Sequence, residues 1–225
     1  MFSVSEEVST HFKHLRVQLS MVHEVIVGRQ VSGLEEYVSR AVEDVKGKFR
    51  LEQLTSHPLV RAYRDFFWRI GIDPTKTRPS AEALLRRVLQ GKDFPRVNSL
   101  VDVYNVVSMS SLVPIAAFDA DHLKGPLHMR FSRAGEVFRG IGMDVPFRLS
   151  GKEVVVEDEE KLVAIYPYRD ADSSKVSEAS RRVLLMACGV PGVEGSYLES
   201  TSQTLVEAVL RFCGGFLSFQ QTVST

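Results

Sequence analysis

The sequence predicts an α+β fold in which N-terminal helices pack on a mostly antiparallel sheet system. Apolar residues recur at helical spacing in the first half of the chain, whereas apolar and polar residues alternate through much of the second half. Turn-forming residues separate the alternating stretches, and strands and helices do not alternate regularly, which favours α+β over α/β. The 225 residues suffice for one large core, so we expect a single domain over residues 1–215 and a frayed tail over 216–225.

The first half is expected to begin with a half-buried strand over Leu15–Val27, where apolar and polar residues alternate. A long amphipathic helix should follow over Gly33–Leu54. A second helix should start after His57-Pro58 and end at the turn Gly71-Ile-Asp-Pro74. On that helix Trp68 lies off the apolar stripe, so it either packs under a neighbour, which we favour, or is exposed as a stacking platform.

The third predicted helix follows Pro79, which suits a first helical turn because it has no N–H to lose. Apolar residues then recur at helical spacing until Gly91 closes the helix. The other face carries Glu82, Arg86 and Arg87 and is expected to be solvated, with Glu82 and Arg86 four residues apart as a favourable surface pair.

The fourth predicted helix starts at Asn98, a good N-cap residue, and is apolar nearly all round, so it should be buried. Asn98, Asp102 and Asn105 interrupt it at spacings of four and three residues, which puts them on one stripe. Buried amides and carboxylates need partners. In one interpretation Asn98 is a cap, Asp102 binds Arg78 or Arg96, and Asn105 satisfies a loop backbone. In the other interpretation the stripe forms one wall of a pocket.

The second half is predicted to consist mainly of strands. They are expected over Leu127–Phe131, Glu136–Ile141, Lys152–Glu157, Leu162–Tyr166 and Arg182–Met186. Between the last two strands, the polar segment that starts at Tyr168 is either a turn or a binding loop. A final helix over about Tyr197–Phe212 should stop at Gly214-Gly215.

Charge and hydropathy exclude several classes of partner. Lys and Arg number 28 and Asp and Glu number 28, so a nucleic-acid contact would need a local basic patch. Such a patch lies between Arg61 and Arg96, where nine basic residues outnumber four acidic ones. No apolar run approaches the length of about 18 residues that a membrane helix needs, and the N-terminus does not have the pattern of a signal peptide. We therefore expect a cytoplasmic protein with no membrane and no DNA partner.

Common catalytic and metal-binding motifs are missing from the sequence. It contains no glycine-rich phosphate loop, no GxSxG elbow and no HExxH motif. Cys188 and Cys213 do not have metal-ligand spacing. The segment Asp170-Ala-Asp172 begins like a calcium loop, but Lys175 and Arg181 occupy positions where that loop needs Gly and Glu. The residues therefore imply no metal and no cofactor.

Four motifs occur in an order that resembles the tRNA-editing (B-three/B-four) domain of the phenylalanyl-tRNA synthetase beta chain. They are ALLRR at residues 83–87, NSLVDVYN from Asn98, PIAAFD from Pro114, and KVSE from Lys175 before a strand. The resemblance covers roughly Pro58 to Val190. It implies a free-standing member of that family, which would hydrolyse aminoacyl-tRNA in trans without a metal, using a positioned water, or would bind tRNA.

The resemblance also implies roles for particular residues. Asn105 matches the family's pocket asparagine, and Asp102 and Asn98 match the motif that holds it. The chain departs from the family where Tyr104 replaces a threonine and Ala116 replaces a histidine. The glycine-rich wall of the family's pocket is replaced by a segment from Tyr168 to Asp172. A bulkier, more charged pocket could take a different aminoacyl group, a free small molecule, or nothing.

Ester hydrolysis needs a placed water, a group that accepts its proton, and donors for the developing oxyanion. We expect Asn105 and Asp102 to act in catalysis, with the substrate bound by Arg78, Asn98, Tyr104, Ala116, Asp119, Tyr168, Arg169, Asp170, Asp172 and Lys175. The tRNA should face Arg86, Arg87, Lys92 and Arg96 through phosphate contacts. Two alternatives stay open: a non-catalytic binding module, which Ala116 favours, and a binder or enzyme for a free amino-acid-like metabolite.

Overall fold

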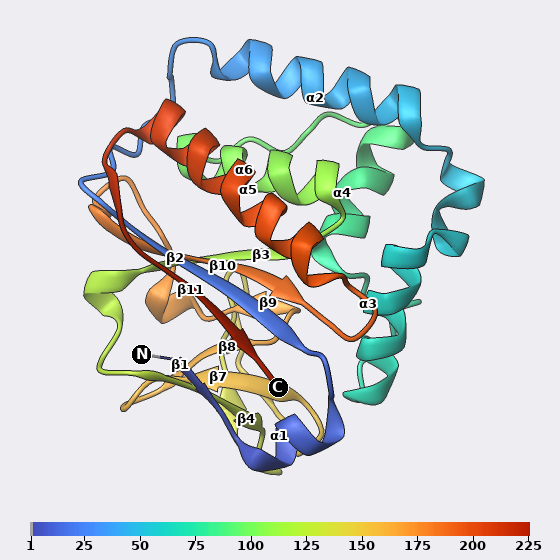
Figure 1. The fold of residues 1–225 in the computed structure, drawn as a ribbon, viewed down its shortest axis with the longest axis vertical. Helices are drawn as coiled ribbons and strands as arrows, with labels where there is room; N and C mark the ends of the chain where they lie inside the picture. Colours follow the sequence, from blue (N-terminus) through green and yellow to red (C-terminus); the bar gives the residue numbers. More distant parts are fainter. Residues whose placement is uncertain (1) are drawn as a thin grey trace.

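The computed structural model describes residues 2–225 and has a helical layer above a central sheet, with a second sheet below it (Figure 1). The central sheet has the order β11-β2-β10-β3, and all its pairs are antiparallel. Its strands are β2 (Arg16–His23), β3 (Ile115–Asp119), β10 (Arg182–Gly189) and β11 (Phe216–Ser224). This arrangement confirms the predicted α+β class.

The second sheet has the order β1-β4-β7-β8-β9, with β1 and β4 parallel and its other pairs antiparallel. Its strands are β1 (Phe2–Val4), β4 (Leu127–Phe131), β7 (Val154–Glu157), β8 (Leu162–Ile165) and β9 (Arg169–Asp170). A small ribbon pairs β5 (Val137–Phe138) with β6 (Phe147–Arg148).

The α-helices of residues 2–225 are α1 (Glu6–His11), α2 (Leu34–Lys48), α3 (Pro58–Arg69), α4 (Ser80–Leu89), α5 (Ser99–Ser111) and α6 (Gly195–Cys213). Five of these six cover one face and one end of the central sheet, whereas α1 lies against β4 of the second sheet (Figure 1). Short 3-10 turns are η1 (Leu51–Ser56), η2 (Ala120–His122) and η3 (Asp172–Ser174). Helices α5 and α6 lie on the central sheet, and α2 lies outside α5 (Figure 1).

Strand β10 is the centre of the fold because it is buried on both faces. Val183 and Leu185 point into the core shared with the helices, whereas Leu184 and Met186 point into the core between the two sheets. This alternation follows from the two-residue period of a strand. The nearly all-round apolar pattern of α5 has a similar cause, since that helix packs against α2, α4, α6 and the central sheet.

Several predicted boundaries are wrong. The strands expected over Leu15–Val27 and Glu136–Ile141 are shorter in the structure, as β2 and β5. The helix expected over Gly33–Leu54 ends at Lys48, because Phe49 adopts an extended backbone (φ −114°, ψ 152°) before η1. The tail over 216–225 is not frayed, because β11 pairs with β2 from Phe216 to Ser224. Gly215 allows the chain to turn from α6 into β11. It has a φ of 85°, and a Cβ there would lie 2.1 Å from the His23 carbonyl oxygen, so a larger residue would not fit.

The expected solvated face of α4 is also corrected. The Glu82 side chain is only 1% exposed and accepts hydrogen bonds from Arg64 Nη2 at 2.8 Å and Arg86 Nε at 2.6 Å. A buried carboxylate needs such partners, so the pair is a buried cluster rather than a surface bridge. Trp68, by contrast, is 55% exposed, so its expected packing under a neighbour is wrong.

Within residues 2–225, none of the helices combines the length and hydropathy that crossing a bilayer requires.

Replacing Glu82 with Gln tests the buried cluster. The change leaves two guanidinium groups around a neutral amide, so we expect a loss of about 3 kcal/mol in the free energy of unfolding, measured by urea denaturation. Glu36→Gln is the matched control, because Glu36 pairs with Arg40 on an exposed surface of α2 and should cost under about 0.5 kcal/mol. Equal effects of the two changes would contradict the assignment of Glu82 to the core.

Candidate functional site

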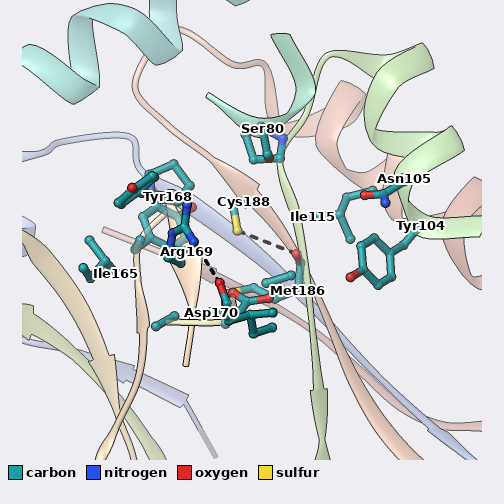
Figure 2. A pocket seen from close by; sticks show the side chains of 16 residues that line it. Ser80, Tyr104, Asn105, Ile115, Ile165, Tyr168, Arg169, Asp170, Met186 and Cys188 are labelled. Atoms are coloured by element: carbon teal, nitrogen blue, oxygen red, sulfur yellow. Dashed lines mark hydrogen bonds between the residues drawn. The ribbon is translucent and has the colours of Figure 1, made fainter. Parts of the chain in front are cut away.

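A cavity of about 200 Å³ lies where the central sheet, the second sheet and the helical layer meet. Figure 2 shows Tyr104 and Asn105 on the opposite side of it from Tyr168 and Arg169, with Asp170, Met186 and Cys188 between them. It is lined by Ser80, Tyr104, Asn105, Pro114, Ile115, Ala116, Ile141, Ala164, Ile165, Tyr166, Pro167, Tyr168, Arg169, Asp170, Met186 and Cys188. It is smaller than the range of about 300–1,000 Å³ typical of drug-sized ligands, so it suits an amino-acid-sized group.

Of the three residues in the polar stripe of α5, two make structural contacts and one lines the cavity. Asn98 caps the helix by accepting a hydrogen bond from the Val101 N–H at 3.0 Å. Asp102 is buried and accepts from Arg96 Nε at 2.7 Å and from the Val97 N–H at 2.8 Å. Neither residue lines the cavity, so their expected catalytic and binding places are corrected to structural ones. Asn105 does line the cavity, as the pocket interpretation predicts.

Asp170 is the titratable group of the cavity. It lies on β9, which pairs with β8, and its carboxylate accepts a hydrogen bond from the Ala117 N–H of β3. Burial raises the pKa of Asp170 to about 7, although that hydrogen bond and the charge of Arg169 both lower it. A carboxyl group with this pKa exchanges a proton near neutral pH, which suits a general base or acid.

Tyr104 and Cys188, which also line the cavity, are neutral. Burial is the main cause of a raised pKa for Tyr104, and the charges of Asp170 and Asp102 add to it, so the phenol stays protonated. Burial also raises the pKa of the Cys188 thiol well above its ordinary value. A thiol of this kind is a poor nucleophile, because the thiolate is the reactive form. The cavity therefore offers acid–base chemistry by a carboxyl group rather than attack by cysteine.

Several residues expected at the site lie elsewhere. Asp119 is buried and caps η2, accepting from the Asp121 N–H at 3.0 Å and from Ser180 Oγ at 2.5 Å. Asp172 and Lys175 form an ion pair with each other at 2.8 Å at the surface. Arg78 is exposed and does not line the cavity.

The expected nucleic-acid surface is only partly available. Arg86 is held by Glu82, and Arg96 is held by Asp102 and Glu35. Arg87 and Lys92 are exposed, although Arg87 Nε donates to the Asp93 carbonyl at 2.6 Å. Arg86 and Arg96 are thus engaged in ion pairs with the protein's own carboxylates, which differs from their expected role as free phosphate contacts.

Sequence reasoning missed the part of the cavity that β10 provides. Met186 and Cys188 face it because alternate residues of β10 point toward the second sheet. The apolar residues within Arg182–Met186 predict a strand. The face of the sheet to which each side chain points depends, however, on pairing with β2 and β3. Ser80 and Ile141 also line the cavity, and no local pattern marks them.

Comparison with known proteins assigns the family. The B3/4 domain family matches residues 62–213, which is more than half of the chain. The chain belongs to the B3/4 domain family. The expected resemblance is therefore confirmed.

Relatives of this B3/4 domain include the phenylalanine–tRNA ligase beta subunit of Bartonella henselae, which is 30% identical over 142 residues. That match covers 53% of this chain and 18% of the subunit. The beta subunit of Corynebacterium jeikeium is 34% identical over 117 residues, covering 52% of this chain and 13% of that subunit. The matched part is thus less than a fifth of either relative.

The fold of this B3/4 domain is similar to that of a solved structure. An N-terminal fragment of the phenylalanyl-tRNA synthetase beta subunit from Pyrococcus horikoshii matches it with a TM-score of 0.56 at 11% identity. The match covers 100% of this chain and 54% of the fragment. The two proteins share an architecture.

Replacing Asp170 with Asn tests its raised pKa through stability. The carboxyl has an ordinary pKa near 4 in the unfolded chain, so native stability should fall as pH rises from about 4 to about 7. In the variant, the free energy of unfolding should not fall over this pH range. By about pH 8 it should exceed that of the native protein by on the order of 2 kcal/mol, measured by urea denaturation at each pH. Asp172→Asn is the control, because Lys175 lowers the pKa of Asp172 and no such gain should appear. A variant that tracks the native protein at every pH would refute the raised pKa.

Proposed function

We propose that this B3/4 domain hydrolyses the ester of an aminoacyl-tRNA in trans, using the cavity beside Asn105 and Asp170. The observation that carries the proposal is that Asn105, the match to the family's pocket asparagine, shares one cavity with a carboxyl group whose pKa is about 7. The beta subunits of phenylalanine–tRNA ligase among the relatives support a tRNA-linked substrate.

In this mechanism the Asn105 amide orients a water molecule against the ester carbonyl, and the Asp170 carboxylate accepts the proton as the water attacks. Arg169 donates hydrogen bonds to the oxyanion that develops on the carbonyl oxygen. The bond between the carbonyl carbon and the ribose oxygen then breaks, and Asp170 returns the proton to that oxygen. The products are a free amino acid and a tRNA with a free ribose hydroxyl.

Asp170 takes the place that Asp102 was expected to fill. Asp102 is committed to Arg96 and lies outside the cavity, whereas Asp170 lines it. Asp170 belongs to the segment from Tyr168 to Asp172, which replaces the glycine-rich wall of the family's pocket. The altered wall therefore supplies the proton acceptor for the proposed reaction.

The tRNA would approach the cavity across exposed cations at both ends of α4. Arg78 is exposed two residues before Ser80, which lines the cavity. Arg87 is exposed in the last turn of α4, and Lys92 is exposed three residues after its end. Exposed Trp68 on α3 adds an aromatic surface of the kind on which RNA bases stack. Phosphate contacts of this kind weaken as salt concentration rises.

A non-catalytic binding module is the second candidate, and one observation favours it. Ala116 lines the cavity at the position where the resemblance expects a histidine. A methyl group there can neither transfer a proton nor donate a hydrogen bond. Under this alternative the cavity would bind an aminoacyl group without turnover.

The deciding assay measures release of labelled amino acid from a panel of correctly and incorrectly charged tRNAs, including D-aminoacyl species. We expect one charged tRNA to be hydrolysed, with a rate that rises through about pH 7 because Asp170 must be deprotonated. Asp170→Asn should lower the rate by about 10²–10⁴-fold, the usual share of a general base. Asn105→Ala should lower it by at least about tenfold, since the water would lose its orientation.

Asp172→Asn serves as the matched control, because it removes a nearby carboxyl that does not line the cavity. Its rate should equal that of the native protein. If no charged tRNA is hydrolysed while salt-sensitive tRNA binding persists, the protein is the binding module instead.

A further inference from the structure

Strand β11 leaves one edge of the central sheet open. It is the end strand of the order β11-β2-β10-β3, and it runs beside β2 from the end of α6 toward the C-terminus (Figure 1). Among residues 2–225, no strand pairs with its outer edge. Phe216, Leu217 and Phe219 on this strand are 38–49% exposed, so the edge is apolar as well as open.

The other strand edges of the two sheets are short or covered. At the far edge of the central sheet, β3 packs against β9, and its Ala117 N–H donates to the Asp170 carboxylate. At the edge formed by β9, the Ile141 N–H donates to the Asp170 carbonyl at 3.0 Å, and Gly140 forms a bridge with Ala171. Strand β1, at the remaining edge, is only three residues long. Short and covered edges resist pairing with another chain, and β11 has neither protection.

Strand β11 also lacks the side chains that normally protect an exposed edge. Its nine residues, FLSFQQTVS, include no Lys, Arg, Asp, Glu or Pro. A β-bulge between Leu217 and Phe219 disrupts the start of the strand, but the pairing with β2 is regular from Phe219 to Ser224. The regular part therefore offers six residues in the geometry that a further antiparallel strand needs.

The direction of the backbone groups follows from the pairing with β2. The Thr225 N–H donates to the Leu15 carbonyl at 3.1 Å, toward β2. Because the hydrogen-bonding groups of successive residues alternate between the two sides of a strand, the N–H and C=O groups of Gln220, Thr222 and Ser224 point away from β2. These groups can bond a further strand.

We propose that β11 pairs antiparallel with β11 of a second copy of this chain, about a two-fold axis through Gln221. The two central sheets then join into one continuous sheet. The axis places Gln220 opposite Thr222 of the second copy, so the outward backbone groups of both strands are bonded. It also places Phe219 opposite Val223 of the second copy, on the face toward the second sheet. Pairs of an aromatic and a β-branched residue stabilise antiparallel strands.

The absence of charge on β11 favours a second copy over a different partner. Across a two-fold axis any charged side chain faces its own like, and like charges directly opposite each other destabilise a strand pair. Because β11 carries no charge, self-pairing meets no such repulsion, and a partner of opposite charge finds nothing to recognise. A two-fold interface uses the same surface on both copies, so it closes as a dimer. None of residues 216–224 lines the cavity, which makes this inference independent of the proposed function.

Sedimentation equilibrium over a range of protein concentrations tests the pairing. We expect the apparent mass of the native protein to rise from that of a monomer to twice that mass as its concentration rises. Gln221→Lys and Gln221→Glu should each lower the association constant at least about tenfold, because like charges meet at the axis. An equal mixture of the two variants should recover dimerisation, because the charges at the axis are then opposite.

Gln53→Lys is the matched control, because Gln53 is an exposed glutamine of η1, which belongs to neither sheet, and this variant should dimerise like the native protein. Urea denaturation checks that each variant is folded. A native protein that stays monomeric at every soluble concentration overturns the inference, and so does native-like dimerisation of both Gln221 variants. A mixture of the two folded variants that stays monomeric overturns the pairing about Gln221.

Discussion

The burial of strand β10 on both faces is the constraint on which most of this structure depends. From Val183 to Gly189 the strand is buried, so both its odd and its even residues must meet apolar partners. One set meets the helices and the other meets the second sheet, which fixes a three-layer order. Because β10 pairs with both β2 and β3, it also fixes the register of the central sheet.

The site follows from the same constraint. Ala116 and Ala117 of β3 pair with β10, and the N–H of Ala117 reaches Asp170 on the edge strand of the second sheet. Asp170 is therefore held where two layers approach each other, and water is largely removed from around it. Removing water from a carboxylate is costly, so the group keeps its proton to a higher pH than an exposed one. The same meeting of layers creates the small cavity that Asn105 and Arg169 share.

Local patterns in the sequence predict the helices and part of the site. The spacing on one helix predicts a cap at Asn98 and leaves Arg78 or Arg96 as partners of Asp102 and a loop backbone or a pocket as surroundings of Asn105. The structure has the cap, the pair of Asp102 with Arg96, and Asn105 at the cavity. β3 has no alternating pattern, because all its residues are buried, so periodicity does not reveal it. Periodicity does not reveal the strand at 216–224 for the opposite reason, because most of its side chains are exposed. Arg169 and Asp170 could be identified as polar residues of a loop, but their partners Gly140, Ile141 and Ala117 come from other segments.

The central claim is that the fold holds Asp170 as a carboxyl group that titrates near neutral pH inside a ligand cavity. Carbon-13 NMR of the aspartate side-chain carboxyl groups measures this directly, with Asp170→Asn identifying the resonance. The account predicts a titration midpoint near pH 7 for Asp170. A midpoint near about 4, the value of an exposed aspartate, would contradict it and would leave the cavity without a proton acceptor.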